Sequence, residues 1–219
     1  MSLDAVMFDL DGTLVDTLPV CYLAFRRALE RAGAPILTDA EIHALFGPSE
    51  EGMLQRVLPR DWERALPSYF AEYEQLLPMC PAVIPELSAG LAMLRSRGVR
   101  TALVTGKSRV TALMSVRHFG LDDAFDALEP GSPQGVVKAA AIQRLLESWR
   151  LAPERAIYVG DGAADMVAAR ESGVMAVGAA WAQGARMSEL QAAGAHVIFS
   201  DAAVFVGWLD RQTGHITTG

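Results

Sequence analysis

The sequence contains few cysteines, fewer basic than acidic residues and no long apolar run. Its two cysteines, Cys21 and Cys80, form neither a disulfide framework nor a CxxC motif, so a reducing cytoplasm is the expected location. Lysine and arginine together number 19 against 26 acidic residues, which gives a net charge of -7. Nucleic acid is therefore not an expected partner, because binding to its phosphates needs a basic face.

No segment has the pattern of a membrane anchor or a signal peptide. The longest stretch without charged or strongly polar side chains covers residues 173–182, far short of the roughly 20 residues that a spanning helix needs. The first residues lack a basic segment followed by a long apolar one, so we expect no signal peptide. These absences predict a protein without a membrane partner.

The length and the composition are those of a globular chain. The 219 residues suffice for one large domain, or for one domain with a small one attached, and for a substantial core without disulfides. Hydrophobic residues make up 51% of the chain and charged residues 21%. Disorder is not expected as the main state, because disordered chains are poor in apolar residues.

Short apolar runs alternate with helical patterns through most of the chain. The expected strands are residues 4–10, 101–105, 156–160, 174–177 and 196–199. Helical patterns cover residues 87–95, 110–119, 139–149 and 165–172. Several of these helices are followed by a glycine, such as Gly98 or Gly120, as expected at a helix C-terminus. The alternation predicts an α/β fold with a Rossmann-like parallel sheet, helices on both faces and right-handed crossovers.

One segment interrupts the alternation directly after the first strand. From about residue 17 to residue 79 we find no convincing strand, and helical patterns cover residues 21–32, 51–57 and 60–76. Thr38 and Glu41 have the spacing of a capping box at the start of a further helix. We therefore expect an α/β core domain formed by residues 1–16 and 81–219, and an inserted all-helical domain formed by residues 17–80.

Two aspartates lie where the first expected strand ends. Asp9 and Asp11 belong to the segment DLDGTLVD, residues 9–16. In open parallel sheets, ligands bind beyond the carboxyl ends of the strands. Two bare carboxylates ~4 Å apart repel by about 4 kcal/mol at an effective dielectric constant of 20. A hard divalent cation would offset this repulsion, and oxygen ligands favour Mg²⁺. The alternative is a polar turn in which Asp16 caps the next helix.

A second acidic pair follows the strand expected at residues 156–160. In GDGAAD, residues 160–165, Asp161 falls at the strand end and Asp165 about one turn further on. Taken alone, this pair is also compatible with an ordinary helix N-cap, where aspartate is favoured. Together with Asp9 and Asp11 it predicts a metal site, because both clusters come to the same edge of the sheet.

A hydroxyl and a glycine follow the strand expected at residues 101–105. The strand leads into Thr105, Gly106, Lys107 and Ser108. This combination suits an anion, because free backbone amides and the positive end of a helix dipole point toward it. A plain Ser or Thr helix cap is the simpler explanation when the segment is taken alone.

In this order, the motifs resemble those of the haloacid dehalogenase-like hydrolase superfamily, in particular its phosphoglycolate-phosphatase-like branch. The resemblance covers nearly the whole chain and rests on DLDGTLVDT at residues 9–17, the strand into Thr105, a lysine near residue 138 and GDGAADM at residues 160–166. The helical insert matches the cap domain of the superfamily. The resemblance implies an Mg²⁺-dependent phosphatase acting on a small phosphorylated metabolite, with phosphoglycolate as the leading substrate.

The resemblance also implies roles for the four aspartates. Asp9 would be the nucleophile that forms an aspartyl-phosphate, and Asp11 would be the general acid and then the general base. Mg²⁺ would be held by the Asp9 side chain, the backbone carbonyl of Asp11 and Asp161. Asp165 would be a further ligand or would lie just outside the ligand shell.

The resemblance further implies that Thr105, the amide of Gly106 and a lysine hold the phosphate oxygens. Relatives often carry this lysine in a Lys-Pro pair, whereas this chain has LEPGSP at residues 128–133. The only lysine nearby is Lys138, at the start of the helix expected at residues 139–149. Lys107 is the rival candidate, as a second phosphate or substrate contact. A solvated surface charge is the alternative for either lysine.

Asp11 separates types of reaction. Haloacid dehalogenases lack an aspartate at this position because an alkyl halide needs no protonated leaving group, so Asp11 favours phosphate transfer. A phosphomutase of the β-phosphoglucomutase type and a non-catalytic phospholigand-binding protein are the alternatives. A phosphonatase is disfavoured, because residues 17–80 contain no lysine that could form a Schiff base.

The cap is expected to select the substrate. Its loop FGPSEEG, residues 46–52, resembles the cap segment that faces the active site in relatives. Ser49, Glu50 and Arg56 are therefore candidate substrate contacts, and an ordinary turn between helices is the alternative. The protein is expected to be a monomer or a homodimer.

Overall fold

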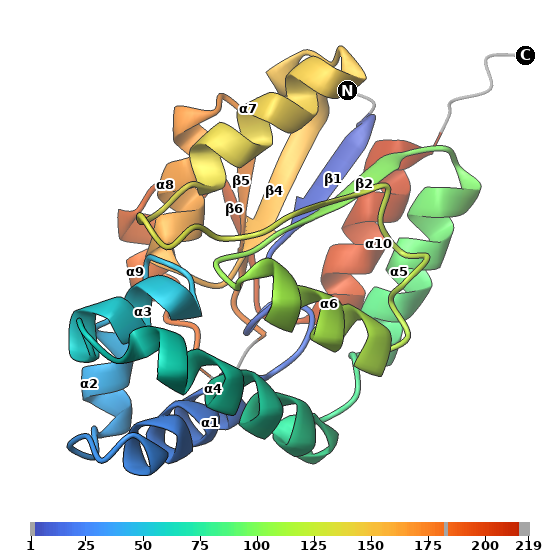
Figure 1. Ribbon diagram of the computed structural model, residues 1–219. Coiled ribbons are helices and arrows are strands. Elements are labelled where there is room, and N and C mark those ends of the chain that lie inside the picture. Colours follow the sequence, from blue (N-terminus) through green and yellow to red (C-terminus); the bar gives the residue numbers. More distant parts are fainter. Residues whose placement is uncertain (1–2, 182–183, 215–219) are drawn as a thin grey trace, which may run out of the picture.

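A six-stranded parallel sheet lies at the centre of the computed structural model, which describes residues 3–181 and 184–214 (Figure 1). The strands are β1 (Ala5–Phe8), β2 (Arg100–Val104), β3 (Ala127–Glu129), β4 (Ala156–Gly160), β5 (Met175–Ala179) and β6 (Val197–Phe199). Their order is β3-β2-β1-β4-β5-β6, and all neighbours are parallel. The expected α/β fold with a parallel sheet is confirmed.

Helices cover both faces of the sheet (Figure 1). The helices α5 (Pro85–Ser96) and α10 (Ala202–Thr213) lie on one face, and α7 (Lys138–Trp149), α8 (Ala163–Glu171) and α9 (Met187–Ala192) lie on the other. Side chains of β1 alternate between the two cores: Val6 and Phe8 face α5 and α10, while Ala5 and Met7 face the opposite layer. A strand buried on both faces needs apolar residues throughout, and β1 has them.

The inserted segment is helical, with a core of its own. It contains α1 (Leu18–Arg31), α2 (Asp39–His43), α3 (Glu50–Val57) and α4 (Trp62–Leu76), followed by the short 3-10 helix η1 (Leu77–Met79). Phe25, Tyr69 and Tyr73 are among its buried side chains. The expected capping box is present, since the Glu41 amide donates to Thr38 Oγ1 at 3.3 Å and the Thr38 amide donates to Glu41 Oε2 at 2.8 Å.

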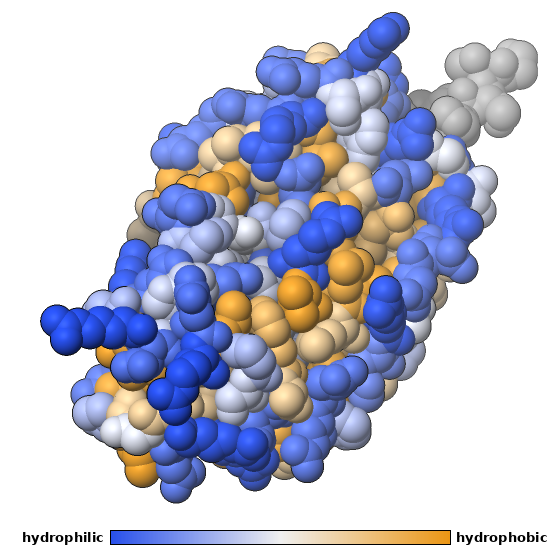
Figure 2. All heavy atoms as spheres, in the orientation of Figure 1, coloured by the Kyte–Doolittle hydropathy of each residue, from blue (hydrophilic) through white to orange (hydrophobic). Residues whose placement is uncertain are grey.

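Polar contacts join this helical insert to the core. The carboxylate of Glu50 accepts hydrogen bonds from the Ser108 amide and the Thr111 hydroxyl, both at 2.6 Å, at the start of α6 (Arg109–His118). The hydroxyls of Tyr73 and Ser115 lie 2.8 Å apart. Apolar side chains gather across the middle of the face seen in Figure 2, over α6 where the insert meets the core. The helical insert therefore packs against α6, the helix that follows the carboxyl end of β2.

One strand and two α-helices were not expected from the sequence. The edge strand β3 has only three residues, all half-buried, and it is held by pairing with β2 and not by an apolar run of its own. The helices α9 and α10 follow the fourth and fifth expected strands, where no helix was assigned. In the described part of the chain, no helix is long and apolar enough to cross a membrane.

Candidate active site

Asp9 lies directly beyond the end of β1, in a buried position. Its backbone amide still donates to the Val159 carbonyl at 2.9 Å, so the carboxylate is fixed by the end of the sheet. Its Oδ2 lies 3.0 Å from Lys138 Nζ, whereas its Oδ1 is buried without a hydrogen-bond partner. Burial raises the pKa of Asp9 from 3.8 to about 7; Lys138 opposes this, and the carboxylates of Asp165 and Asp11 add to it.

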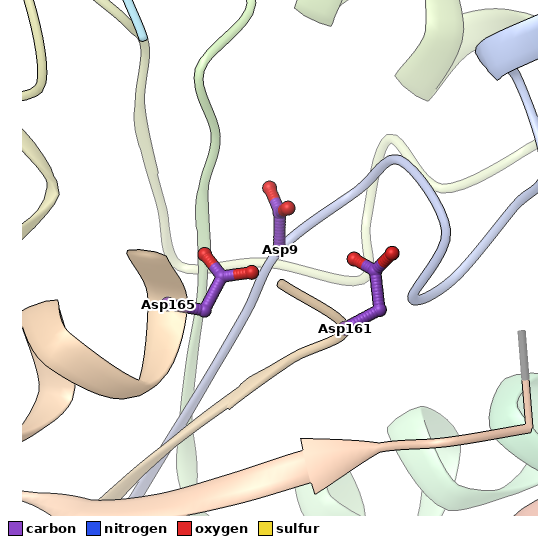
Figure 3. A group of neighbouring side chains, drawn as sticks. All are labelled: Asp9, Asp161 and Asp165. Carbon is purple, nitrogen blue, oxygen red and sulfur yellow. The ribbon is translucent and has the colours of Figure 1, made fainter. Parts of the chain in front are cut away.

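Three carboxylates converge beyond the ends of β1 and β4. Oxygens of Asp9, Asp161 and Asp165 all lie within 4.8 Å of one another, and Figure 3 shows the three side chains around one space. Burial raises the pKa of Asp161 well above its usual range, and the charges of Asp165 and Asp9 raise it further. This group unites the two acidic motifs, which are about 150 residues apart in the sequence.

The donor set fits a hard divalent cation. It consists of carboxylate oxygens, which are the ligands that Mg²⁺ prefers. The unpartnered Oδ1 of Asp9 is a buried acceptor that lacks a donor, and a cation would satisfy it. The raised pKa values of Asp9 and Asp161 have the same cause, since like charges are held together away from water.

Gly12 allows the chain to turn tightly around this site. Its φ of +73° lies in the left-handed region, which favours glycine. A Cβ atom at this position would overlap the carboxylate of Asp161. The next residue, Thr13, donates its hydroxyl to Asp161 Oδ1 at 3.2 Å. The DxDGT motif therefore supplies not only Asp9 but also the space and a donor for Asp161.

Lys138 begins α7 and reaches into the carboxylate cluster. Its Nζ lies 3.0 Å from Asp9 Oδ2 and 2.5 Å from Asp165 Oδ1. Burial alone would lower the pKa of Lys138, but the carboxylates of Asp165 and Asp9 raise it well above its usual range. The hydroxyl of Tyr158 in β4 lies 3.1 Å from Asp165 Oδ1 and holds that carboxylate from the other side. Lys138 is therefore a fixed cation beside Asp9.

Lys107 occupies a different place, beside Asp11. Its Nζ lies 3.2 Å from Asp11 Oδ1 and 3.1 Å from Cys21 Sγ, and 4.4 Å from the centre of the Tyr73 ring. Thr17 donates its hydroxyl to the same Asp11 oxygen. Burial raises the pKa of Asp11, and Lys107 opposes this. Lys107 thus sits between core and cap and is engaged by Asp11.

Thr105 and Gly106 lie on the loop after β2 and line a cavity together with Asp9 and Asp165. Thr105 is buried, and its Oγ1 accepts from the Lys107 amide at 3.2 Å. The Gly106 carbonyl packs against Gly131, where a Cβ atom would not fit. This close approach brings the loop before α7 next to the loop after β2, and with it Lys138.

A cavity of about 530 Å³ lies between the cap and the sheet edge. The predicted residues that line it are Asp9, Asp11, Glu50, Thr105, Gly106, Lys107, Lys138, Asp161 and Asp165. Two candidate substrate contacts do not line it. Ser49 donates its hydroxyl to Glu51 Oε2 at 2.5 Å, and Arg56 is exposed, with Nη1 3.3 Å from the Leu45 carbonyl.

Several residues at the site were not singled out in the sequence. Thr13 and Thr17 belong to the segment DLDGTLVDT, and their closeness to Asp11 in the sequence could have identified them. Tyr158 belongs to an apolar strand and has no such signal. The aromatic lining of the cavity comes from separate helices of the insert that no sequence motif connects.

Known proteins resemble this chain in sequence and in structure. A family model described as haloacid dehalogenase-like hydrolase matches residues 6–179. A phosphoglycolate phosphatase of Neisseria meningitidis is 30% identical over 191 residues, covering 82% of this chain and 81% of that protein. A solved haloacid dehalogenase-like family hydrolase of Streptococcus pneumoniae has a TM-score of 0.75 at 27% identity, covering 94% of this chain and 98% of that one.

A further relative is longer than this chain. The tyrosine-protein kinase PtkA of Mycobacterium tuberculosis is 33% identical over 182 residues, covering 82% of this chain. The matched region is only 62% of that protein, so this chain spans less than two thirds of its length.

Proposed function

The chain belongs to the haloacid dehalogenase-like hydrolases, and from this premise we propose that it is an Mg²⁺-dependent phosphatase of small phosphomonoesters. The observation that carries the proposal is the environment of Asp9. Its carboxylate is buried, one oxygen has no partner, and the other faces Lys138. A nucleophile for phosphorus needs this combination of a fixed anion and nearby positive charge.

In the proposed reaction, an Asp9 oxygen attacks phosphorus and the ester P–O bond breaks. Asp11 donates its proton to the leaving alcohol oxygen, and the phosphoryl group remains on Asp9 as an aspartyl-phosphate. Asp11 then accepts a proton from a water molecule that attacks the same phosphorus, which releases inorganic phosphate and restores Asp9. Lys138, Thr105 and the Gly106 amide hold the phosphoryl oxygens during both steps.

The metal would be bound by the carboxylates of Asp9 and Asp161 and by the Asp11 backbone carbonyl, with Asp165 as a ligand or just outside. When bound, it supplies the positive charge that lets an anionic nucleophile approach an anionic phosphate. Asp165 keeps Lys138 in place in either case, because its Oδ1 lies 2.5 Å from Lys138 Nζ.

We propose that residues 17–80 act as a cap that opens to admit substrate and closes to exclude bulk water. The contacts of Glu50 and Tyr73 with the start and middle of α6 support a closed arrangement. Both cysteines are free, which supports the cytoplasm as the place of the reaction.

The test is phosphate release from p-nitrophenyl phosphate by the wild type and by Asp9→Asn, each with Mg²⁺ and with EDTA. We expect activity only for the wild type with Mg²⁺, and Asp122→Asn, an exposed aspartate outside the cavity, serves as the matched control. Full metal-dependent activity of Asp9→Asn would show that the mechanism is wrong.

Product analysis identifies the acceptor of the phosphoryl group. Phosphoglycolate is included in the substrate panel because one relative is named a phosphoglycolate phosphatase. Release of inorganic phosphate supports the hydrolase. An isomerised sugar phosphate would instead indicate a mutase. Transfer of phosphate from ATP to tyrosine in a peptide would indicate a tyrosine kinase, the activity in the name of PtkA. Thermal stabilisation by phosphates without turnover would indicate a binding protein.

A further inference from the structure

The wall of the cavity that the cap supplies is apolar and aromatic. Tyr22 and Phe46 stack with ring centres 5.9 Å apart, and the His43 ring lies 4.9 Å from that of Phe46. Deeper in the cap, Phe25 and Tyr69 meet edge to face at 6.0 Å. Rings in these arrangements offer flat faces and edges to another ring.

The cations that line the cavity are already engaged. In the described part of the chain they are Lys107, Lys138 and Arg186, and none of them comes from the cap. Lys138 contacts Asp9 and Asp165, and Lys107 contacts Asp11.

The third cation, Arg186, lies at the rim. It pairs with Glu189 at 3.1 Å, and its side chain is 75% exposed. In the cap wall, His43 shares its Nδ1 with the Tyr22 hydroxyl at 3.0 Å. Among the described residues, the space beyond the phosphate position therefore offers a second anionic group no buried lysine or arginine that lacks a carboxylate partner.

Glu50 adds a negative charge to the same wall. It lines the cavity, is only 5% exposed and holds its position through the Ser108 amide and the Thr111 hydroxyl. A leaving group with its own carboxylate would be buried against apolar rings and a carboxylate. Burying an unpaired charge in such surroundings is strongly unfavourable.

The cavity is large enough for a substituted ring. Its volume of about 530 Å³ lies within the range of sites for drug-sized ligands, roughly 300–1,000 Å³. The phosphate end is fixed on the core side by Asp9 and Lys138, so the rest of the substrate lies toward the cap.

We propose that the substrate is the phosphomonoester of an uncharged aromatic alcohol, and that the cap selects against leaving groups that carry a carboxylate. This inference rests on the proposed phosphatase function and specifies its substrate class. The products are then the aromatic alcohol and inorganic phosphate, formed by the two steps given above. Phosphoglycolate, whose leaving group carries a carboxylate, is a poor substrate under this proposal.

The experiment compares benzyl phosphate with the same molecule bearing a para carboxylate, with phosphoglycolate as a third substrate. The two benzyl esters differ in charge but share the ring and the type of leaving oxygen. We expect kcat/KM for benzyl phosphate to exceed the values for both carboxylates by about tenfold or more. Equal or higher kcat/KM for either carboxylate would overturn the proposal.

A pair of variants tests whether the cap wall causes the preference. Phe46→Arg places a cation in the wall at a position that is 37% exposed, whereas Ile36→Arg places it on the cap outside the cavity, at a position that is 68% exposed. Phe46→Arg should lower the ratio of kcat/KM between the two benzyl esters by about fivefold, the upper range for a partly exposed ion pair. The Ile36→Arg ratio should match the wild type.

Different results overturn the substrate class and the phosphatase activity. Turnover of p-nitrophenyl phosphate together with a preference for carboxylates overturns the substrate class and leaves the phosphatase standing. Equal effects of the two arginine variants also overturn it, because the wall would then not be the cause. Absence of turnover on every ester overturns the phosphatase proposal and this inference with it.

Discussion

Replacing Asp9 with asparagine should stabilise the metal-free protein above neutral pH while it abolishes activity. Asparagine has nearly the shape of a protonated aspartic acid but carries no charge at any pH. The wild-type carboxylate is buried near those of Asp161 and Asp165. One oxygen from each of the three carboxylates lies within 4.8 Å of the others. Without a metal, ionisation of Asp9 is therefore unfavourable in the folded protein.

The pKa gives the size and the sign of the effect. The pKa of Asp9 rises from its ordinary value of 3.8, which applies to the unfolded chain, to about 7 in the folded protein. The folded state therefore keeps a proton that the unfolded state has released, and the wild type loses stability as the pH rises from 3.8 through about 7. A difference of about 3 in pKa corresponds to roughly 4 kcal/mol in the free energy of unfolding. For a chain of this length, that is about 8–16 °C in Tm.

The assay is thermal unfolding in EDTA at pH 5 and pH 8 for the wild type, Asp9→Asn and the exposed control Asp122→Asn. Asp9→Asn should gain less at pH 5, where only part of the effect has developed, than at pH 8, and Asp122→Asn should follow the wild type at both. Added Mg²⁺ should raise the Tm of the wild type at pH 8 more than that of Asp9→Asn, because a ligand that binds only the folded state stabilises it.

If Asp9→Asn is no more stable than the wild type in EDTA at pH 8, or if its gain is the same at both pH values, ionisation of Asp9 is not costly in the folded state. The cluster would then not need a cation to offset its charge. That result would leave the fold and the family unaffected.

Three further predictions concern the support of the site. Lys138→Met should lower kcat on p-nitrophenyl phosphate by about 10²–10³-fold, as the loss of one charge-stabilising donor does; a change of less than a few fold in steady-state kinetics would contradict the role. Gly12→Ala should weaken Mg²⁺ binding in calorimetric titration because its Cβ overlaps the Asp161 carboxylate, whereas Gly33→Ala, with a similar positive φ and open space, should bind Mg²⁺ normally. Tyr158→Phe should cost about 1–3 kcal/mol in urea unfolding, since it removes a buried donor beside the Val104 carbonyl and Asp165 Oδ1, and unchanged stability would contradict this.

Local features of the fold could be predicted because their causes are local. The apolar run before Asp9 predicts a strand that is buried on both faces of a sheet, and this holds whichever strands lie beside it. The Thr38 capping box is formed by residues three apart, so neighbouring residues suffice to specify it. The acidic motifs could be assigned to one sheet edge for a similar reason, since the carboxyl ends of parallel strands share an edge.

Elements that depend on distant partners could not be predicted. The strand β3 has no apolar run of its own and is held by hydrogen bonds to β2, more than 20 residues earlier. Arg56 was a candidate contact because it lies near the cap loop, but the packing of α3 leaves its side chain exposed. Which face of a short helix is buried depends on the helices packed against it, which the local pattern does not specify.

The positions of Lys107 and Lys138 also depend on distant partners that the sequence does not reveal. Both lysines follow strands or begin helices near the sheet edge, so the sequence allowed either one beside the phosphate. The crossover into α7 brings Lys138 to 3.0 Å from Asp9, while the cap packs over Lys107 and directs it to Asp11. Likewise, the aromatic wall is built from α1, the α2–α3 region and α4, which meet only when the cap folds. Residue types and their spacing specify the chemistry available at a strand end, whereas long-range packing decides which side chains meet there and what they exclude.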